Sequence, residues 1–212
     1  MGRGGLFVVI EGLDAAGKTT LVKRLVSTYR RQGMRLTTVR EPGGTRVSEQ
    51  ARRILLDARS DICPQSELFL YLTARAQLVL DVIRPALERN ELVIADRFSL
   101  STYAYQIGGR GLPEGEVIAA DRLARNGIAP DLTVLLTVSE AEARRRKRRA
   151  GMKSDRMERQ SRKFYQAVRA EYLRQAKKRR GIMLIDSEAG ADAVYDRVKS
   201  QIDRRLHRRG MA

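Results

Sequence analysis

The chain has few of the residues that form disulfides and zinc sites: its 212 residues include one cysteine, one histidine and no tryptophan. Cys63 has no second cysteine with which to form an internal disulfide, and Cys63 and His207 are too few to hold a zinc ion. The longest apolar runs, at residues 6–10 and 132–137, fall far short of the roughly 20 residues of a membrane helix. A strand-like segment close to the first residue leaves no room for a signal peptide. We therefore expect a cytoplasmic protein with no membrane partner.

Acidic residues are also few in comparison with basic ones. Lys and Arg number 42 and Asp and Glu 25, which gives a formal net charge of +17. Such a charge attracts anionic partners, either nucleotides or nucleic acids. Basic runs lie at residues 144–149, 177–180 and 204–209, and the last two are most simply solvated helix faces. Since no Pro-, Ser- or Gly-rich stretch suggests a linker, we predict a single domain over residues 1–212.

Apolar segments of strand length recur along the chain, and helical patterns separate them. They lie at residues 6–10, 36–39, 92–95, 132–137 and 182–185. Strands that alternate with helices are typical of a parallel sheet that is covered on both faces. The sequence therefore predicts an α/β fold with a doubly wound, central parallel sheet of five strands and helices on both faces.

Apolar residues at helical spacing are expected to pack in the core. They form two sets: Met157, Phe164, Val168 and Tyr172, and Val194, Val198, Ile202 and Leu206. A longer segment, residues 65–88, also has a helical pattern. Its end should be disturbed by Pro85, which has no backbone N–H to donate.

The most specific motif directly follows the first predicted strand. Gly12, Leu13, Asp14, Ala15, Ala16, Gly17, Lys18 and Thr19 match the pattern GxxxxGK[ST], and a helical pattern begins at Lys18. In this strand-loop-helix setting, a P-loop binds phosphates with backbone N–H groups and the helix N-terminus. We expect residues 12–20, including Thr20, to bind ATP, with Lys18 as a catalytic phosphate ligand and Thr19 as a ligand of Mg²⁺. A P-loop alone does not separate kinases from GTPases or other ATPases.

Two other predicted strands end in polar residues. The strand at 92–95 is followed by Asp96, Arg97 and Phe98, and the strand at 36–39 by a turn with the sequence REPGGT at residues 40–45. Ligands of α/β proteins bind beyond the carboxyl ends of parallel strands. Asp96 is suited to Mg²⁺ and Arg97 to a phosphate, although an Asp-Arg pair at a strand end is often only a salt bridge.

Together these segments resemble the bacterial thymidylate kinase family, whose pattern includes a REPGGT loop and a DR[YFH] strand end. The chain has both in matching order, together with Arg75 in the segment LTARAQ and the segment STYAYQ at residues 101–106, followed by Gly109, Arg110 and Gly111. The similarity extends from residue 6 to about residue 185. It implies a homodimeric enzyme that uses Mg²⁺ and transfers the γ-phosphoryl group of ATP to dTMP, giving ADP and dTDP.

The resemblance also implies roles for residues of the acceptor site. Asp14 would accept a hydrogen bond from the sugar 3′-hydroxyl, Tyr71 would stack on thymine, and Arg75 would bind the thymine O4. Tyr105 would lie under C2′ and leave no room for a ribose hydroxyl, whereas Tyr103 is assigned to packing. The other acceptor ligands would be Glu41, Pro42, Arg97, Ser101 and Thr102. In the alternative interpretation, an ordinary amphipathic helix buries Tyr71 in the core and exposes Arg75 on the surface.

The basic run at 144–149 resembles the start of the family's lid, which would span about residues 144–156. The P-loop has Ala15 and Ala16 where some family members carry a catalytic arginine, so the resemblance implies that the catalytic arginines lie in the lid. The candidates are Arg148, Arg149 and Arg156, with Arg146 behind them. Phosphoryl transfer depends on positive charge around the migrating group, which a basic lid would supply. The run could instead be a solvated helix face.

Two other functions stay open from the sequence alone. The acceptor could be another nucleoside monophosphate or a deoxynucleoside, in which case the acceptor pocket would differ and the P-loop would not. A nucleic-acid-binding P-loop ATPase would also suit the net charge. The chain lacks aromatic-rich RNA motifs, zinc spacings and a helix-turn-helix signature, so we expect no specific nucleic-acid partner.

Overall fold

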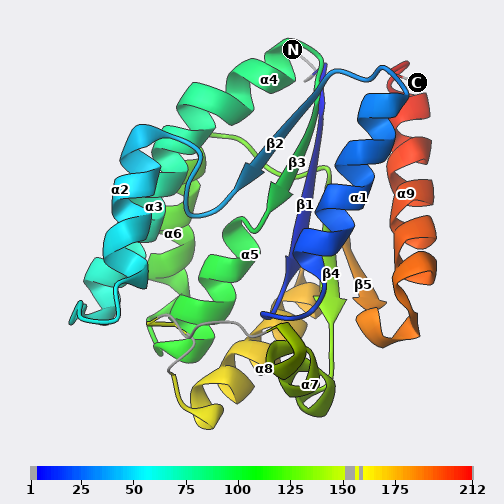
Figure 1. Cartoon of the computed structure of the whole chain (residues 1–212). Helices are drawn as coiled ribbons and strands as arrows, with labels where there is room; N and C mark the ends of the chain where they lie inside the picture. Colours follow the sequence, from blue (N-terminus) through cyan, green and yellow to red (C-terminus); the bar gives the residue numbers. More distant parts are fainter. Residues whose placement is uncertain (1–3, 151–155, 158–159, 212) are drawn as a thin grey trace.

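The computed structural model describes residues 4–150, 156–157 and 160–211 and contains a central sheet of five parallel strands. The strand order is β2-β3-β1-β4-β5 (Figure 1). The strands are β1 (Leu6–Gly12), β2 (Leu36–Arg40), β3 (Leu92–Asp96), β4 (Leu132–Thr137) and β5 (Ile182–Asp186). The predicted parallel α/β sheet is thereby confirmed, and each predicted strand matches an observed one.

Helices cover both faces of the sheet (Figure 1). On one face, Leu6, Val8 and Ile10 of β1 pack against α1 (Lys18–Arg31) and α9 (Ala191–Arg208). On the other face, Phe7 and Val9 pack with residues of α3 (Pro64–Leu78) and α4 (Arg84–Glu88). Because β1 is buried on both faces, its residues 6–10 form a continuous apolar run without alternation.

The remaining helices complete the layer on the second face and the carboxyl edge of the sheet. They are α2 (Arg46–Leu56), α5 (Ser99–Thr102), α6 (Glu114–Arg125), α7 (Glu140–Ala150) and α8 (Arg162–Lys178), with a short 3₁₀ turn at Ser187–Ala189. Within the described residues, no helix combines the length and apolar character needed to cross a membrane.

The helix predicted over residues 65–88 forms, and it changes geometry before Pro85. A π-helical segment, Val79–Ile83, separates α3 from α4, and Pro85 lies in the first turn of α4. Proline cannot donate to the carbonyl four residues earlier, and a wider helical turn accommodates this missing bond. A second π-helical segment, Tyr103–Gly109, follows α5.

Both predicted core stripes are buried. The stripe of α9 lies on one helix, as expected. In the other stripe, Phe164, Val168 and Tyr172 belong to α8, but Met157 precedes it. The helix α8 begins after Ser161, whose side chain accepts the N–H of Phe164 as a standard N-cap. Met157 is therefore a buried residue of the turn before α8 and does not belong to the helix.

Candidate active site

The P-loop between β1 and α1 depends on residues with positive φ. Gly12 has a φ of 138°, and a Cβ there would lie 2.4 Å from the carbonyl oxygen of Leu136, so only glycine fits. Ala15 and Gly17 have φ values of 63° and 93°. No side chain in the described part of the chain caps α1 at Gly17. The N-terminal N–H groups of this 14-residue helix are thus available to an anion.

Lys18 folds back over the loop. Its Nζ donates to the carbonyl oxygens of Gly12 and Leu13 at 3.0 and 2.9 Å and lies 3.9 Å from Asp14 Oδ1. The side chain is buried, and this burial, together with the nearby positive charge of Arg97, lowers the pKa of Lys18 to about 8. An ATP phosphate would restore a strong anionic partner to this ammonium group.

Thr19 and Asp96 meet where β1 and β3 end. Ile10 of β1 pairs with Asp96 of β3, and the Thr19 hydroxyl donates to Asp96 Oδ2 at 3.3 Å. Asp96 Oδ1 is buried and has no hydrogen-bond partner among the described residues. A buried carboxylate oxygen without a partner is costly unless a ligand satisfies it. A hydroxyl beside such a carboxylate suits Mg²⁺, which uses one or two carboxylates plus water and phosphate oxygens.

Arg97 connects the P-loop to the other side of the site. Its backbone adopts a φ of 75°, unusual for a residue with a side chain, and is held by its N–H, which donates to the Ile10 carbonyl. The guanidinium donates to Asp14 Oδ1 at 2.6 Å, to the Ser101 hydroxyl at 3.1 Å and to the Tyr172 hydroxyl at 3.2 Å. Asp14 and Arg97 therefore lie side by side between the P-loop and a neighbouring cavity.

Asp14 carries a negative charge among several cations. Burial raises the pKa of Asp14, but the positive charges of Arg97, Lys18 and Lys147 outweigh that effect, and the resulting pKa is below the usual value. Asp14 is thus ionised and able to accept a hydrogen bond from a ligand hydroxyl.

Glu11 is a buried residue that sequence reasoning missed. Its carboxylate accepts the N–H groups of Phe98 and Ser101 at 2.8 and 3.1 Å and the Ser101 hydroxyl at 2.5 Å. Burial raises the pKa of Glu11, while its bonds to Ser101 and Phe98 and the charge of Arg97 oppose that rise. Glu11 fixes the turn that carries Arg97. The available signal was a single acidic residue between the apolar run at residues 6–10 and Gly12.

This neighbouring cavity lies between the P-loop, the loop after β2, α3 and the segment after α5. It has a volume of about 140 Å³. Among the predicted acceptor residues, all of the following line it: Asp14, Glu41, Pro42, Tyr71, Arg75, Arg97, Ser101, Thr102 and Tyr105. The fold thus brings together nine residues that the sequence places on five separate segments.

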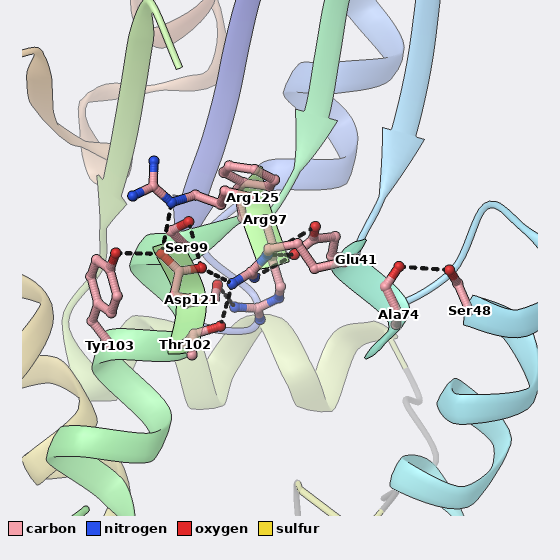
Figure 2. A network of polar contacts seen from close by, with 12 residues as sticks. Glu41, Ser48, Ala74, Arg97, Ser99, Thr102, Tyr103, Asp121 and Arg125 are labelled. Atoms are coloured by element: carbon pink, nitrogen blue, oxygen red, sulfur yellow. Dashed lines mark hydrogen bonds and ion pairs between the residues drawn. The ribbon is translucent and has the colours of Figure 1, made fainter. Parts of the chain in front are cut away.

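Arg75 lies at the base of this acceptor cavity and is 1% exposed. Its Nε and Nη2 donate to the Glu41 carboxylate, and its Nη1 donates to Thr102 Oγ1 and Asp121 Oδ1 at 2.9 and 2.6 Å. Figure 2 shows Glu41, Thr102 and Asp121 converging in this network. The alternative that places Arg75 on the surface is therefore wrong, because two buried carboxylates hold the guanidinium inside.

Tyr71 and Tyr105 form walls of the same cavity. Tyr71 is half-buried and lies one helical turn before Arg75 on α3. Tyr105 is buried, its ring lies 5.4 Å from the Arg97 guanidinium, and its hydroxyl has no hydrogen-bond partner within the described residues. Tyr103 packs in the core as expected, and its hydroxyl also donates to Asp121.

Several lining residues were not predicted: Arg52, Leu56, Gln106 and Met157. Arg52 extends from α2 and donates to the Pro42 carbonyl at 2.9 Å, which adds a cation to the lining of the acceptor cavity. A basic residue on the helix after the REPGGT turn was the only sequence signal for it.

The predicted lid begins as α7, and its cations point in different directions. Arg148 and Arg149 are exposed. Arg146 is half-buried and donates to the carbonyl oxygens of Ala15 and Ser187 at 3.2 and 3.0 Å. Arg156 is buried, and Nη2 donates to Glu67 Oε2 at 2.6 Å. Residues 151–155 of the predicted lid lie outside the described residues.

Two more cavities flank the P-loop. The lining of one includes Ala16, Gly17, Thr20, Arg146 and Ser187. The other is lined by Leu13, Asp14 and the cations Arg144, Lys147, Arg162 and Arg169 of α7 and α8. Lys147, which was not predicted, faces Asp14 from the lid side, and its Nζ lies 5.5 Å from the Tyr165 ring.

A phosphate-binding loop that shares Asp14 with a separate acceptor cavity defines a P-loop nucleotide kinase. The particular family follows from comparison with known proteins. The model of the thymidylate kinase family matches residues 10–198. The chain belongs to the thymidylate kinase family.

Similar proteins span nearly the whole chain. A thymidylate kinase from Caldanaerobacter subterraneus is 42% identical over 203 residues, which cover 95% of this chain and 97% of the relative. A thymidylate kinase from Leifsonia xyli is 38% identical and covers 96% and 97% of the two chains. The crystal structure of the Ehrlichia chaffeensis thymidylate kinase superposes with a TM-score of 0.73 at 27% identity and covers 94% of this chain and 99% of that one.

Titration of Lys18 should make ATP binding depend on pH. A lysine whose pKa is lowered from 10.5 to about 8 is protonated below pH 8 and loses its proton as the pH rises through that value. Because only the ammonium form bonds to phosphate, the dissociation constant of ATP should be level below pH 8 and rise by up to about tenfold per pH unit above it. Calorimetric titrations at pH 7, 8 and 9 measure this. Lys18→Arg keeps its charge throughout and should remove the rise; an unchanged rise in that variant would assign the titration to another group.

Proposed function

We propose that the chain transfers the γ-phosphoryl group of ATP to dTMP, giving ADP and dTDP, as a single kinase domain. One observation carries this proposal: Asp14 and Arg97 join a P-loop to a cavity that contains Tyr71 and the buried Arg75. Transfer in line requires the donor and acceptor phosphates to meet, and this junction is where they would do so. We also propose a cytoplasmic location, where both substrates are available.

ATP would bind along the P-loop. The N–H groups at the start of α1 and the ammonium group of Lys18 would hold its phosphates, and Thr19 and Asp96 would hold Mg²⁺, partly through water. The metal would neutralise charge on the β- and γ-phosphates. The cavity beside Gly17 and Thr20 is continuous with the helix N-terminus and suits the nucleoside end of ATP, with Arg146 over it.

The acceptor would lie in the cavity with its base toward Arg75 and its phosphate toward Arg97. Tyr71 would stack on the base, an interaction of about 1–3 kcal/mol per base. Asp14 would accept a hydrogen bond from the 3′-hydroxyl, and Tyr105 would lie under C2′. Glu41, Pro42, Ser101 and Thr102 would complete the contacts. Glu41 and Thr102 already hold the Arg75 guanidinium in place, which preorganises this part of the site.

A substrate panel tests this assignment. ADP release measured with each nucleoside monophosphate in turn should be fastest with dTMP, and the ribose analogue of dTMP should react more slowly because of Tyr105. Tyr105→Ala should narrow the difference between these two acceptors, and Lys18→Ala should abolish turnover in a folded protein. Equal rates with all monophosphates, or near-normal turnover of folded Lys18→Ala, would refute the proposal.

The lid would add positive charge around the migrating phosphoryl group. The candidates are Arg148, Arg149 and Arg156, and Lys147 joins them because it faces Asp14. We expect at least one of the four alanine variants to lower the turnover number by on the order of 10²–10³ with little change in the Michaelis constant for dTMP, since a group that acts only in the transition state affects the rate alone. Full turnover in all four variants would identify the basic run as a solvated helix face. Arg197→Ala, on α9, is a charge-matched control.

A homodimer would cover an apolar surface on the helical layer that carries Tyr71 and Arg75. The exposed apolar residues of this surface come from α2, α3, the π-helical segment and α6: Val47, Ile54, Phe69, Leu80 and Leu123. Phe69 and Leu80 lie eleven positions apart and so share a helix face. Large exposed apolar side chains grouped on neighbouring helices mark an interface.

Charged substitutions on this surface should separate the two copies. Phe69→Asp combined with Leu80→Asp should convert a dimer to a monomer in sedimentation velocity, because each carboxylate would be buried at the interface. Leu184→Asp is the control, since Leu184 is exposed on the edge strand β5 and does not belong to the apolar surface on the helices. A wild-type monomer, or dissociation in the control alone, would contradict the proposal.

A further inference from the structure

A basic cavity lies apart from the P-loop, beside the first residues of β4 and β5. It has a volume of about 350 Å³, and its polar lining includes Ser99, Tyr103, Thr133, Arg125, Arg179 and Arg180. The P-loop follows the carboxyl end of β1, whereas Thr133 and Ile182 lie where β4 and β5 begin. The cavity also reaches Glu11, Phe98 and Ser99 beside the carboxyl ends of β1 and β3, but none of residues 12–20 lines it, so it is separate from the proposed ATP site.

The charge in this cavity is only partly neutralised. Arg179 donates through Nε to the neutral Gln175 Oε1 at 2.8 Å and lies 4.5 Å over the Tyr103 ring. Arg180 is exposed, and neither Arg179 nor Arg180 forms an ion pair with a carboxylate of the described residues. The one carboxylate in the wall, Glu11, is already bonded to the Phe98 and Ser101 N–H groups. Three guanidinium groups around a cavity of this size form a site for an anion with several oxygen atoms.

One side of the cavity is joined to the acceptor site by the buried carboxylate of Asp121. Asp121 Oδ2 accepts the Tyr103 hydroxyl and Arg125 Nε at 2.5 and 2.9 Å. Its other oxygen, Oδ1, accepts Arg75 Nη1 at 2.6 Å and the Ser99 hydroxyl at 3.0 Å. Figure 2 shows Arg125 and Tyr103 on one side of Asp121 and Glu41 beyond its other side. Asp121 thus bonds both to Arg125 of the basic cavity and to Arg75, which is proposed to bind the base of dTMP.

We propose that this cavity binds the phosphate groups of a small anion and that binding there weakens the binding of dTMP. A bound phosphate chain competes with Asp121 for the Arg125 guanidinium. Asp121, deprived of one cation in a buried setting, attracts Arg75 more strongly and draws it from its position between Glu41 and the base. The coupling rests on the proposed placement of the acceptor beside Arg75, whereas the anion site itself does not.

The phosphate chain could belong to a free polyphosphate or to a nucleotide, and direct titration distinguishes the two. The wild type, with its P-loop saturated by a non-hydrolysable ATP analogue and Mg²⁺, is titrated by calorimetry with tripolyphosphate and separately with CTP at constant free Mg²⁺. We expect one further site for each ligand. Equal affinities identify the phosphate chain as the recognised group, and tighter binding of CTP shows that the nucleoside also contributes.

Variants test whether this site is the cavity. Arg179→Ala combined with Arg180→Ala should weaken the additional binding at least about tenfold, as expected for the loss of charge-assisted hydrogen bonds. Arg122→Ala is the matched control, because Arg122 is exposed on α6 one turn from Arg125 and does not line the cavity. Absence of a second site in the wild type, or equal weakening in the control, overturns the proposal.

The coupling has its own readout, which does not depend on turnover. Saturating tripolyphosphate should raise the dissociation constant of dTMP by about fivefold or more, and dTMP should raise that of tripolyphosphate by the same factor. Arg125→Lys, which cannot hold Asp121 and a phosphate with one planar group, should reduce both effects while dTMP still binds. Anion binding without any change in dTMP affinity would overturn the coupling. If dTMP itself fails to bind, the proposed function fails, whereas the titration of the anion site still stands.

Discussion

Parallel hydrogen bonding among β1, β2 and β3 brings together the three loops that meet at the active site. In this register Ile10, Arg40 and Asp96 lie at the same height in the sheet, so β2 and β3 end together and β1 ends two residues later. The P-loop, the REPGGT turn and the Asp96-Arg97 step all begin within two residues of that edge. A shift of one residue in any strand would turn its side chains to the other face. Donor and acceptor sites are therefore adjacent because the strands are aligned.

Buried charge is the second constraint, and the acceptor site concentrates it. Arg75 and Asp121 are almost fully buried, and each is held by several charged or hydroxyl groups. Burial raises the pKa of Glu41 even though Arg75 opposes the rise. Removing one partner of such a set leaves an uncompensated charge in a low-dielectric interior, which costs several kcal/mol. The network thus positions the Arg75 guanidinium, and through Asp121 it also connects Arg75 to Arg125 in the wall of the basic cavity.

The basic residues of α7 differ in whether they reach the P-loop. Along α7, Arg146 reaches the P-loop carbonyl of Ala15, Lys147 faces Asp14, and Arg148 and Arg149 point to solvent. A helix rotates about 100° per residue, so four consecutive basic residues cannot all face one ligand. Only part of the net charge of +17 can therefore act on a phosphate at the site.

The sequence by itself determined the five strands, the P-loop and the family, because these depend on local periodicity and on contiguous motifs. The nine acceptor residues that the family resemblance implied also line one cavity. Only the tertiary structure revealed the parts played by Glu11, Arg52, Asp121 and Lys147. Glu11 meets Tyr172 across 161 positions and Asp121 meets Arg75 across 46, and no local pattern reports such contacts. Whether a charged side chain is buried or exposed depends on which partners the packed helices bring to it, and this is decided only when the chain folds.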